Sequence, residues 1–253
     1  MRESIIGDFR KANSPETSPE ELKRLALSDD DVIRAAVVHN QSRPVSCIEI
    51  LFNDKSDIVK EALAMNNYPV YPQITKANKV IGKTLVLRNA NQSDAEFIVK
   101  LRTNEKKGRF ISSTSSDIDK QREWLRSYGD SDDQAYFIIE DMNSNKYGTV
   151  RMYNSIKHSF CWGSWVISED APTNFAIESA LVVYNYAKTL GFFDSHFEVM
   201  KGNCSVIKFH ERFGAERIGE NEIEYQYKIT KDNIERSLKR YSKYLPEGIK
   251  IHP

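Results

Sequence analysis

The stretch from Trp165 to Ala215 constrains the fold of this chain more than any other part of it. An apolar strand at 165–167 leads through a polar loop into an amphipathic helix at 175–190, and a second strand follows at 197–200. Gly191, which is free to take a positive φ, ends the helix. Segments that alternate between strand and helix periodicity are typical of domains in which helices cover a sheet. We therefore expect a sheet-based domain here.

Further elements on both sides enlarge this domain. Ser93 and Glu96 have the spacing of a capping box, which predicts a helix from Ala95. Residues 143–146 have the composition of a hairpin turn. The expected elements are strand 84–88, helices 95–102 and 117–128, strands 135–140, 148–153 and 159–167, helix 175–190, strand 197–200, helix 205–213, strands 217–218 and 222–229, and helix 232–244. This order predicts an α+β fold with a mixed, mostly antiparallel sheet flanked by helices.

Residues 18–66 contain an internal repeat with a period of 26 residues. The matching positions are Leu22, Leu25, Val32, Ile33, Arg34, Ala36, Val37 and Asn40, which pair with Ile48, Leu51, Ile58, Val59, Lys60, Ala62, Leu63 and Asn66. Each unit reads as two short helices. The first begins after Ser18 with Pro19 at its first position, and the second begins near the acidic cluster 29–31. The pattern predicts a helical solenoid and resembles leucine-rich-variant or HEAT-type repeats.

Two interpretations of the repeat stay open. It could present a surface that binds a protein partner, or it could be a stabilising cap, because solenoids usually need at least three repeats to stand alone. Residues 67–79, with Pro69 and Pro72, are the expected linker. The expected domains are therefore residues 1–75, an all-α helical-repeat domain, and residues 80–253, which hold the mixed sheet and the C-terminal helix.

Composition excludes several function classes. The 36 basic and 36 acidic residues balance, so no long-range field attracts nucleic acid or an anionic membrane. Cys47, Cys161 and Cys204 are too few and too scattered for a disulfide framework or a zinc site. The N-terminus lacks the apolar core of a signal peptide, and no apolar stretch is long enough to span a bilayer. We expect a soluble, cytoplasmic protein without a metal; the sequence does not indicate its oligomeric state.

A motif follows the second strand of the opening stretch. Residues 203–215 read Asn-Cys-Ser-Val-Ile-Lys-Phe-His-Glu-Arg-Phe-Gly-Ala. This run resembles the Asn-x-x-Ala-Ile-x-Leu-Tyr-Glu-Lys-x-Gly-Phe segment of the GNAT superfamily, the acetyl-CoA-dependent N-acetyltransferases. The order of elements over residues 83–230 is similar to theirs. The resemblance implies a GNAT-type fold, acetyl-CoA as the acetyl donor and a primary amine as the acceptor.

The resemblance also implies where acetyl-CoA binds. The pantetheine arm would pair with the strand end formed by Trp165, Val166 and Ile167. The pyrophosphate would lie on the N-terminus of the next helix, where free amides and the helix dipole attract an anion. The amides there belong to Asn174, Phe175, Ala176 and Ile177. The pantetheine would also meet Asn203 and Ser205, although Asn203 equally suits a helix cap.

The pyrophosphate loop departs from the family pattern, Gln/Arg-x-x-Gly-x-Gly/Ala. Residues 168–176 read Ser-Glu-Asp-Ala-Pro-Thr-Asn-Phe-Ala, without a glycine to let the backbone approach the phosphates. Glu169 and Asp170 would repel a diphosphate if they faced it. Either Pro172 and Asn174 hold the same turn by other means, or coenzyme A binding is weakened and the domain is a non-catalytic scaffold or binding protein.

Two residues are candidates for proton transfer. His210 occupies the position at which many GNAT enzymes have tyrosine, the proton donor to the departing thiolate, and a partly protonated imidazole would act as a general acid. A histidine that is merely packed or solvated is the alternative. Glu198 lies on the strand face opposite Phe197 and Val199 and is the candidate general base, unless it is only solvated or salt-bridged.

The acceptor pocket of this fold is built from the first two helices and the middle strands. Residues 101–104, 110–111 and 121–125 are similar to those of acetyltransferases that act on nucleotide-linked amino sugars. The Leu-Arg-x-Asn pattern is also that of ribosomal-protein N-terminal acetyltransferases. Arginines pair with phosphate, and aromatic rings stack on a base or sugar. The candidate substrate-binding residues are Arg102, Trp124, Arg151 and Tyr153, with Arg109 beside them.

We therefore expect an N-acetyltransferase whose preferred acceptor is an amino group on a nucleotide sugar. Acetylation of protein N-termini or lysines, with the repeats helping to select the protein, is the alternative activity. The non-catalytic scaffold is the alternative from a different class.

Overall fold

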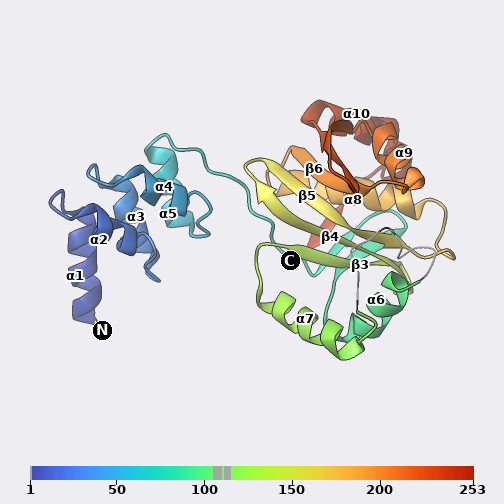
Figure 1. The fold of residues 1–253 in the computed structure, drawn as a ribbon, viewed down its shortest axis with the longest axis horizontal. Helices are drawn as coiled ribbons and strands as arrows, with labels where there is room; N and C mark the ends of the chain where they lie inside the picture. Colours follow the sequence, from blue (N-terminus) through green and yellow to red (C-terminus); the bar gives the residue numbers. More distant parts are fainter. Residues whose placement is uncertain (1, 105–109, 111–114) are drawn as a thin grey trace. The chain divides into compact units, whose positions relative to one another are not determined.

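The chain divides into two compact units between Gln73 and Ile74. The computed structural model describes residues 2–104, 110 and 115–253 (Figure 1). Each unit has a hydrophobic core of its own. No helix in these described ranges is long and apolar enough to cross a membrane.

The first unit is helical. Over its described residues it contains α1 (Arg2–Asn13), α2 (Pro19–Leu25), α3 (Asp31–His39), α4 (Val45–Leu51) and α5 (Asp57–Met65). The bounds of α2 and α3 recur in α4 and α5 at an offset of 26 residues. The expected caps are present: Ser18 Oγ accepts from the amide of Glu21 at 3.3 Å, Pro19 is the first residue of α2, and the Asp30 carboxylate caps α3.

The repeat pattern does not predict α1. This helix ends at Asn13, 26 residues before His39 at the end of α3, so it takes the place of the second helix of a preceding pair. Helix α3 packs against both α1 and α5. Asn40 fixes the first contact, because its side-chain amide donates to the carbonyl oxygens of Ala12 and Ser14 at 2.8 and 2.9 Å.

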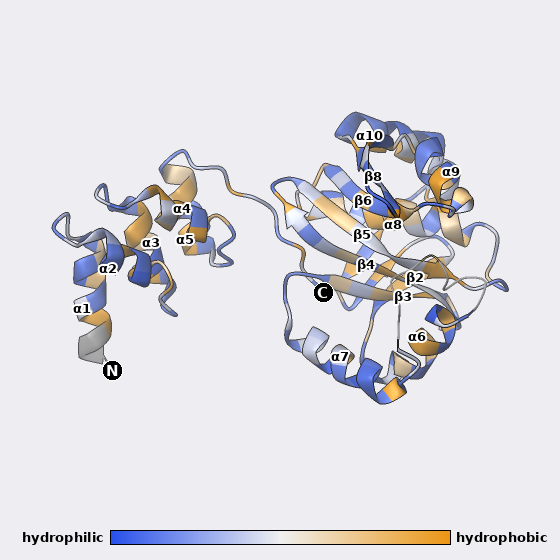
Figure 2. Ribbon diagram, viewed as in Figure 1, coloured by the Kyte–Doolittle hydropathy of each residue, from blue (hydrophilic) through white to orange (hydrophobic). Residues whose placement is uncertain are grey.

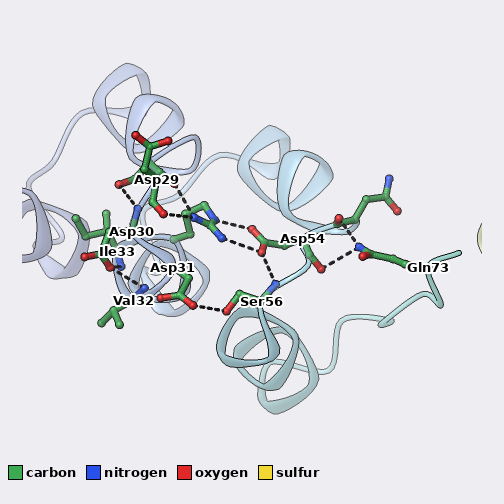
Figure 3. Close-up of polar contacts among 11 residues, drawn as sticks. Asp29, Asp30, Asp31, Val32, Ile33, Asp54, Ser56 and Gln73 are labelled. Carbon is green, nitrogen blue, oxygen red and sulfur yellow. Dashed lines mark hydrogen bonds and ion pairs between the residues drawn. The ribbon is translucent and has the colours of Figure 1, made fainter. Parts of the chain in front are cut away.

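Polar bonds join the two helix pairs (Figure 3). Arg34 donates to both carboxylate oxygens of Asp54, at 2.6 and 3.0 Å, and the Ser56 hydroxyl donates to Asp31 at 2.7 Å. Bidentate pairing of arginine with a carboxylate is strong and directional. These bonds therefore fix how the second helix pair stacks on the first.

The segment expected to be a linker contains the boundary between the two units, and its two ends pack on the units that they adjoin. Tyr68 packs edge-on against Phe52 of the first unit, with ring centroids 6.2 Å apart, and Gln73 donates to the carbonyl oxygen of Asp54 at 3.0 Å. Ile74 is buried in the core of the second unit. The burial of Ile74 and the packing of Tyr68 anchor the segment at both ends, and a linker role for it stays a prediction.

The second unit is built on one sheet. Counted over the described residues, it has nine strands in the order β7-β8-β6-β5-β4-β3-β2-β1-β9, and β5–β6 is the one parallel pair. The strands are β1 (Lys79–Ile81), β2 (Leu85–Asn89), β3 (Ala135–Asp141), β4 (Lys146–Ile156), β5 (Ser159–Ile167), β6 (Asp194–Met200), β7 (Glu216–Glu220), β8 (Glu224–Ile229) and β9 (Lys250–His252). The helices are η1 (Gln92–Asp94), α6 (Ala95–Arg102), α7 (Ile118–Asp130), α8 (Phe175–Thr189), α9 (Cys204–Arg212), α10 (Lys231–Arg240) and η3 (Ser242–Tyr244).

Helices cover both faces of this sheet. Tyr136 and Ile138 of β3 pack with α6 and α7, whereas Phe137 and Ile139 belong to the larger core with α8, as strand alternation requires. In Figure 1, α6 and α7 lie on the side of the sheet opposite α9 and α10; Figure 2 shows that α10 is mostly hydrophilic. The expected α+β fold, a mostly antiparallel sheet flanked by helices, is confirmed.

Some local expectations were wrong. Helix α6 begins at Ala95 as expected, but the capping box before it is formed by Asn91 and Asp94 rather than by Ser93 and Glu96. The Asp94 side chain is fully buried and also accepts from two cationic side chains of neighbouring strands, which hold its charge in place. Strands β1 and β9 lie outside the expected order because three residues are too short to show alternation.

Candidate active site

Strands β5 and β6 diverge along their length. Their parallel pairing covers only 159–161 against 194–196, although both strands continue well beyond these residues. A bulge bends β5: Ser164 has a φ of +47°, and its carbonyl oxygen accepts from Thr149 Oγ1 at 2.8 Å. The two strands therefore open into a V beyond Cys161.

A cavity of about 180 Å³ lies in this opening. Aromatic side chains and several polar groups line it together, a combination that small-molecule sites use to bind and orient a ligand. Its lining includes Trp162 and Trp165 of β5, Phe197 and Glu198 of β6, Asn203 before α9, His210 of α9, Tyr153 of β4 and Glu224 of β8.

An aromatic cage holds the imidazole of His210. The ring centroids of Phe197, Trp162 and Phe209 lie 4.2, 5.2 and 5.7 Å from its own, and the residue is 5% exposed. Its Nδ1 atom is buried without a hydrogen-bond partner in the described part of the chain. Burial lowers the pKa of His210 to about 3, because a charged imidazole loses its hydration there.

This pKa corrects one sequence expectation. His210 is neutral at pH 7, so the partly protonated imidazole expected from the ordinary pKa is not present. A neutral imidazole still has one N–H group and can donate a hydrogen bond to developing negative charge. A catalytic role for His210 stays a prediction, with this changed chemistry.

Of the strand-end residues expected to meet the pantetheine arm, one lines the cavity and two do not. Trp165 lines the cavity, and its indole Nε1 donates to Ser179 Oγ at 3.1 Å. Val166 and Ile167 pair with β4 on the far side of the bulge and do not line the cavity. Their contact with a cofactor stays a prediction.

The N-terminus of α8 offers free amides. Within the described residues, the N–H groups of Asn174, Ala176 and Ile177 donate to no acceptor, whereas that of Phe175 donates to the carbonyl oxygen of Pro172 at 3.0 Å. Free amides at the positive end of a 15-residue helix form an anion site.

A side-chain network takes the place of glycine in the preceding loop. Asn174 Nδ2 donates to Thr84 Oγ1 at 2.7 Å and to Glu178 Oε2 at 3.0 Å, and the buried Glu178 accepts from the Thr84 amide at 2.6 Å. Asn174 therefore ties the loop to the start of β2 and does not cap α8 with its side chain.

The free amides at the start of α8 are groups that a diphosphate could accept hydrogen bonds from, despite the missing glycines. The acidic residues Glu169 and Asp170 are exposed. Binding of a diphosphate to the amides of Asn174, Ala176 and Ile177 stays a prediction.

Asn203 and Ser205 lie at the start of α9. Asn203 lines the cavity and precedes the helix, but its side chain makes no bond to a helix amide; its Oδ1 accepts from Ser205 Oγ at 3.3 Å. The side-chain cap considered from the sequence is therefore not formed. Asn203 keeps its amide available at the cavity wall.

On the acceptor side, Tyr153 lines the cavity and Arg151 lies behind it. The Arg151 guanidinium is 4.8 Å from the ring centroid of Tyr153 and 5.2 Å from that of Trp124. Its Nε atom is buried without an acceptor in the part of the chain that is described, and burial lowers the pKa of Arg151. The Tyr153 ring lies over Gly163, where a Cβ atom would approach the phenol oxygen to 3.0 Å.

The other acceptor candidates lie away from the cavity wall. Trp124 stacks on Tyr128, with centroids 5.8 Å apart and rings 5° from parallel, and it is 37% exposed. Arg102 ends α6 and is also outside the lining. Arg109 lies outside the described residues. The structure thus brings Tyr153 to the cavity, with Arg151 and Trp124 stacked behind it.

The residues that line the cavity but were not expected from the sequence include Trp162 and Glu224. Strand alternation could have assigned Trp162 to the same face as the buried core, but nothing local shows that β8 lies beside β6 and so brings Glu224 to the site.

Comparisons with known proteins agree with this geometry. The family model for the acetyltransferase (GNAT) domain matches residues 84–216. The chain is 40% identical to FdhC, a nucleotide-linked sugar GNAT solved in its apo form; the match covers 68% of this chain and 99% of that one, with a TM-score of 0.58.

More distant structures share the fold. A GCN5-related N-acetyltransferase from Brucella melitensis is 16% identical over 68% of this chain and 88% of its own, with a TM-score of 0.58. Spermidine N-acetyltransferase from Vibrio cholerae, solved with CoA and spermine, is 19% identical over 60% of this chain and 98% of its own, with a TM-score of 0.54. No curated protein sequence matches the chain significantly.

Proposed function

Because the chain belongs to the GNAT family of acetyltransferases, we propose that its acceptor is an amino group on a nucleotide-linked sugar. As a GNAT N-acetyltransferase it uses acetyl-CoA as the acetyl donor. The observation that carries the acceptor assignment is the 40% identity to a nucleotide-linked sugar GNAT along 99% of that protein.

The opening between β5 and β6 is the proposed place of the pantetheine arm. Trp165 and Asn203 line it, and the amides of Asn174, Ala176 and Ile177 suit the pyrophosphate. Acetyl-CoA supplies an activated acyl carbon there. When the protein holds that carbon beside an amine, the reaction becomes effectively unimolecular. This positioning lowers the entropic part of the activation barrier.

Glu198 is the proposed general base. Its carboxylate lies on the cavity wall, is exposed, and has no hydrogen bond or ion pair within the described part of the chain. A free carboxylate can accept the proton that an ammonium group must lose before it becomes a nucleophile. His210, being neutral, would donate a hydrogen bond to the negative charge that develops on the leaving group.

Arg151 is proposed to contact the diphosphate of the acceptor. No salt bridge neutralises it in the described residues, and it is held in place by two aromatic rings rather than by a carboxylate. A guanidinium that is fixed in this way can pair with phosphate oxygens. Trp124 and Tyr153 would then lie beside the nucleotide, and Arg102 would approach from α6.

A second acceptor class is favoured by one observation. Two carboxylates, Glu198 and Glu224, line the cavity, and a peptide N-terminus or lysine is a cation before it loses a proton. Acidic residues at the cleft therefore also suit acetylation of a protein. The recurring helix pairs of residues 1–73 supply a possible protein-binding surface for that activity, and we propose that they form a separate helical-repeat domain.

An acetylation panel tests the acceptor assignment. The full chain would be assayed with acetyl-CoA against UDP- and dTDP-linked sugars that carry an amino group at C2, C3 or C4, against spermidine, and against peptides with free N-termini. We expect turnover with a nucleotide-linked sugar. Turnover restricted to peptides would replace this acceptor with the protein one.

A further inference from the structure

Glu198 and Glu224 lie on one face of the sheet. Strands β6 and β8 are antiparallel, with Glu198 opposite Gln226 and Met200 opposite Glu224. Directly opposed residues share a face, as do alternate residues along a strand. The two carboxylates are therefore diagonal neighbours across the strand pair, and both line the cavity.

Within the described ranges, neither carboxylate has a counter-charge. No hydrogen bond or ion pair of the Glu198 or Glu224 carboxylate is present in the ranges described, and none of the described residues that line the cavity is lysine or arginine. Glu224 is half-buried. Two unneutralised carboxylates on one cavity wall favour a cation between them.

A second polar group in the same cavity also lacks a partner. His210 is 5% exposed and lines the cavity, and its buried Nδ1 has no hydrogen-bond partner within the described residues. A buried polar atom without a partner costs free energy unless something else binds it. Among the described residues, the cavity thus has a neutral unpaired imidazole on α9 and two carboxylates without partners on β6 and β8.

We infer that Glu224, with Glu198, forms the subsite for the ammonium group of the acceptor, and that Glu224 selects an amine over a hydroxyl group. The inference rests on the proposed function and adds a residue to it. The acceptor enters as an ammonium ion between the two carboxylates. One N–H bond breaks and the proton passes to Glu198, which becomes a carboxylic acid; Glu224 stays ionised and holds the amine in place.

The negative charge of this subsite determines which end of a nucleotide-linked acceptor lies beside Glu198 and Glu224. A diphosphate beside Glu198 and Glu224 would be repelled, whereas Arg151 lies behind Tyr153 without a carboxylate partner in the described part of the chain. The amino sugar therefore occupies the carboxylate end of the cavity, and the diphosphate points toward Arg151.

Steady-state kinetics of the full chain test the role of Glu224. The probes are the amine with the highest kcat/KM in the panel above and its hydroxyl counterpart, the same compound with OH in place of the amino group, used as an inhibitor. The variants are Glu224→Gln and Glu224→Asp, with Glu222→Gln as the matched control, because Glu222 is exposed and does not line the cavity.

We expect Glu224→Gln to raise the KM of the amine about tenfold, since a charged hydrogen-bonding partner is lost, and to change kcat by less than about threefold. The Ki of the hydroxyl counterpart and the KM of acetyl-CoA should not change, and Glu224→Asp should recover part of the loss. Glu222→Gln should match the wild type.

Two results would overturn the inference. Equal losses for the amine and its hydroxyl counterpart, or an unchanged KM in Glu224→Gln, would remove Glu224 from amine recognition while leaving the proposed function intact. Absence of turnover with every amine in the wild type would instead overturn the proposed function, and this inference with it.

Discussion

The imidazole of His210 lies 4.2 Å from the ring of Phe197, centroid to centroid, at an interplanar angle of 37°. The contact joins α9 to β6 at the point where β6 has left β5, so it closes one wall of the cavity. Aromatic rings surround the imidazole, and none of the described residues stabilises its protonated form by charge, so burial is the cause of its lowered pKa.

The stability of the protein should therefore depend on pH through His210. The pKa of this residue is about 3 in the folded state and near 6.5 when unfolded. Above pH 6.5 both states are neutral. Between pH 6.5 and 3 only the unfolded state binds the proton, so the free energy of unfolding falls as pH falls, by up to about 1.4 kcal/mol per pH unit.

Denaturant unfolding at pH 7.5, 6.0 and 4.5 measures this loss. The wild type should lose more stability on acidification than His210→Phe, which keeps an aromatic ring in the cage but has no proton to bind. Equal losses in the two proteins would mean that His210 does not resist protonation in the folded state.

His210 should also matter for the rate. His210→Ala should lower kcat by about 10²-fold and leave the affinity for acetyl-CoA nearly unchanged, because a hydrogen bond to developing charge acts mainly in the transition state. Phe209→Leu is the control, since it alters the same aromatic cluster without removing a hydrogen-bonding group. An unchanged kcat in His210→Ala, with the chemical step rate-limiting, would exclude the role.

The features that could be predicted from the sequence are local ones. The side chains of Ser18 and Asp30 each accept a hydrogen bond from a backbone amide at the start of the following helix. Each of these bonds joins residues no more than three positions apart, so a local pattern is enough to indicate it. The order of strands and helices follows from periodicity in the same way. The start of α6 at Ala95 was predictable, but its capping box was not, because Asp94 is also held by Arg88 of β2 and by Lys146 of β4, which is 52 residues away.

The chemistry of the site depends on residues that are far apart in the sequence. Nothing near His210 in the chain shows that Trp162 and Phe197 enclose it, so its neutral state could not be predicted. Glu224 reaches the cavity only because β8 pairs with β6. The hydrogen bond between Asn174 and Thr84 likewise joins residues 90 positions apart. It could not be predicted from the residues of the loop itself.

The free amides of α8 predict a charge-sensitive cofactor site. Ala176→Asp places a carboxylate in the first turn, where it suits the helix dipole but repels a pyrophosphate. We expect the affinity for acetyl-CoA to fall about tenfold, because the carboxylate repels the pyrophosphate. The melting temperature should not fall, because a negative charge at a helix N-terminus is favourable. Ala176→Ser is the neutral control.

Titration calorimetry with acetyl-CoA and with S-acetylpantetheine shows whether the loss of affinity comes from the pyrophosphate. S-Acetylpantetheine lacks the pyrophosphate, so Ala176→Asp should bind it as the wild type does. A similar loss for both ligands would place the defect elsewhere in the cavity.

Arg151 should distinguish nucleotide-linked acceptors from free amines. Arg151→Met keeps an apolar stem between Trp124 and Tyr153 but removes the charge. The KM of a nucleotide-linked amino sugar should rise about tenfold, while that of the same amino sugar without the nucleotide should stay constant. The control is Arg126→Met, which removes an exposed arginine of α7 that pairs with Glu123. A KM that is unchanged for the nucleotide-linked acceptor would remove the diphosphate contact.

Finally, the boundary between the two units predicts where the chain can be shortened. Ile74 is buried in the core of the second unit, and Lys76 donates to the carbonyl oxygens of Tyr128 and Gly129 at the end of α7, at 2.6 and 2.9 Å. A chain that begins at Ile74 keeps these contacts, whereas one that begins at Lys79 loses them. Removing one buried isoleucine costs about 1.5–3 kcal/mol, and each kcal/mol lowers the melting temperature of a domain of this size by about 2–4 °C.

We therefore expect residues 74–253 to melt close to the second transition of the full chain and to acetylate a small amine at a similar rate. Residues 79–253 should melt at least several degrees lower, because both the apolar contact and the bonds that satisfy the carbonyl groups of α7 are missing. Thermal unfolding of the two shortened chains, followed by acetylation of the best small amine, measures both effects. If residues 74–253 were insoluble or inactive, the first unit would be an integral cap of the acetyltransferase domain rather than a separate domain.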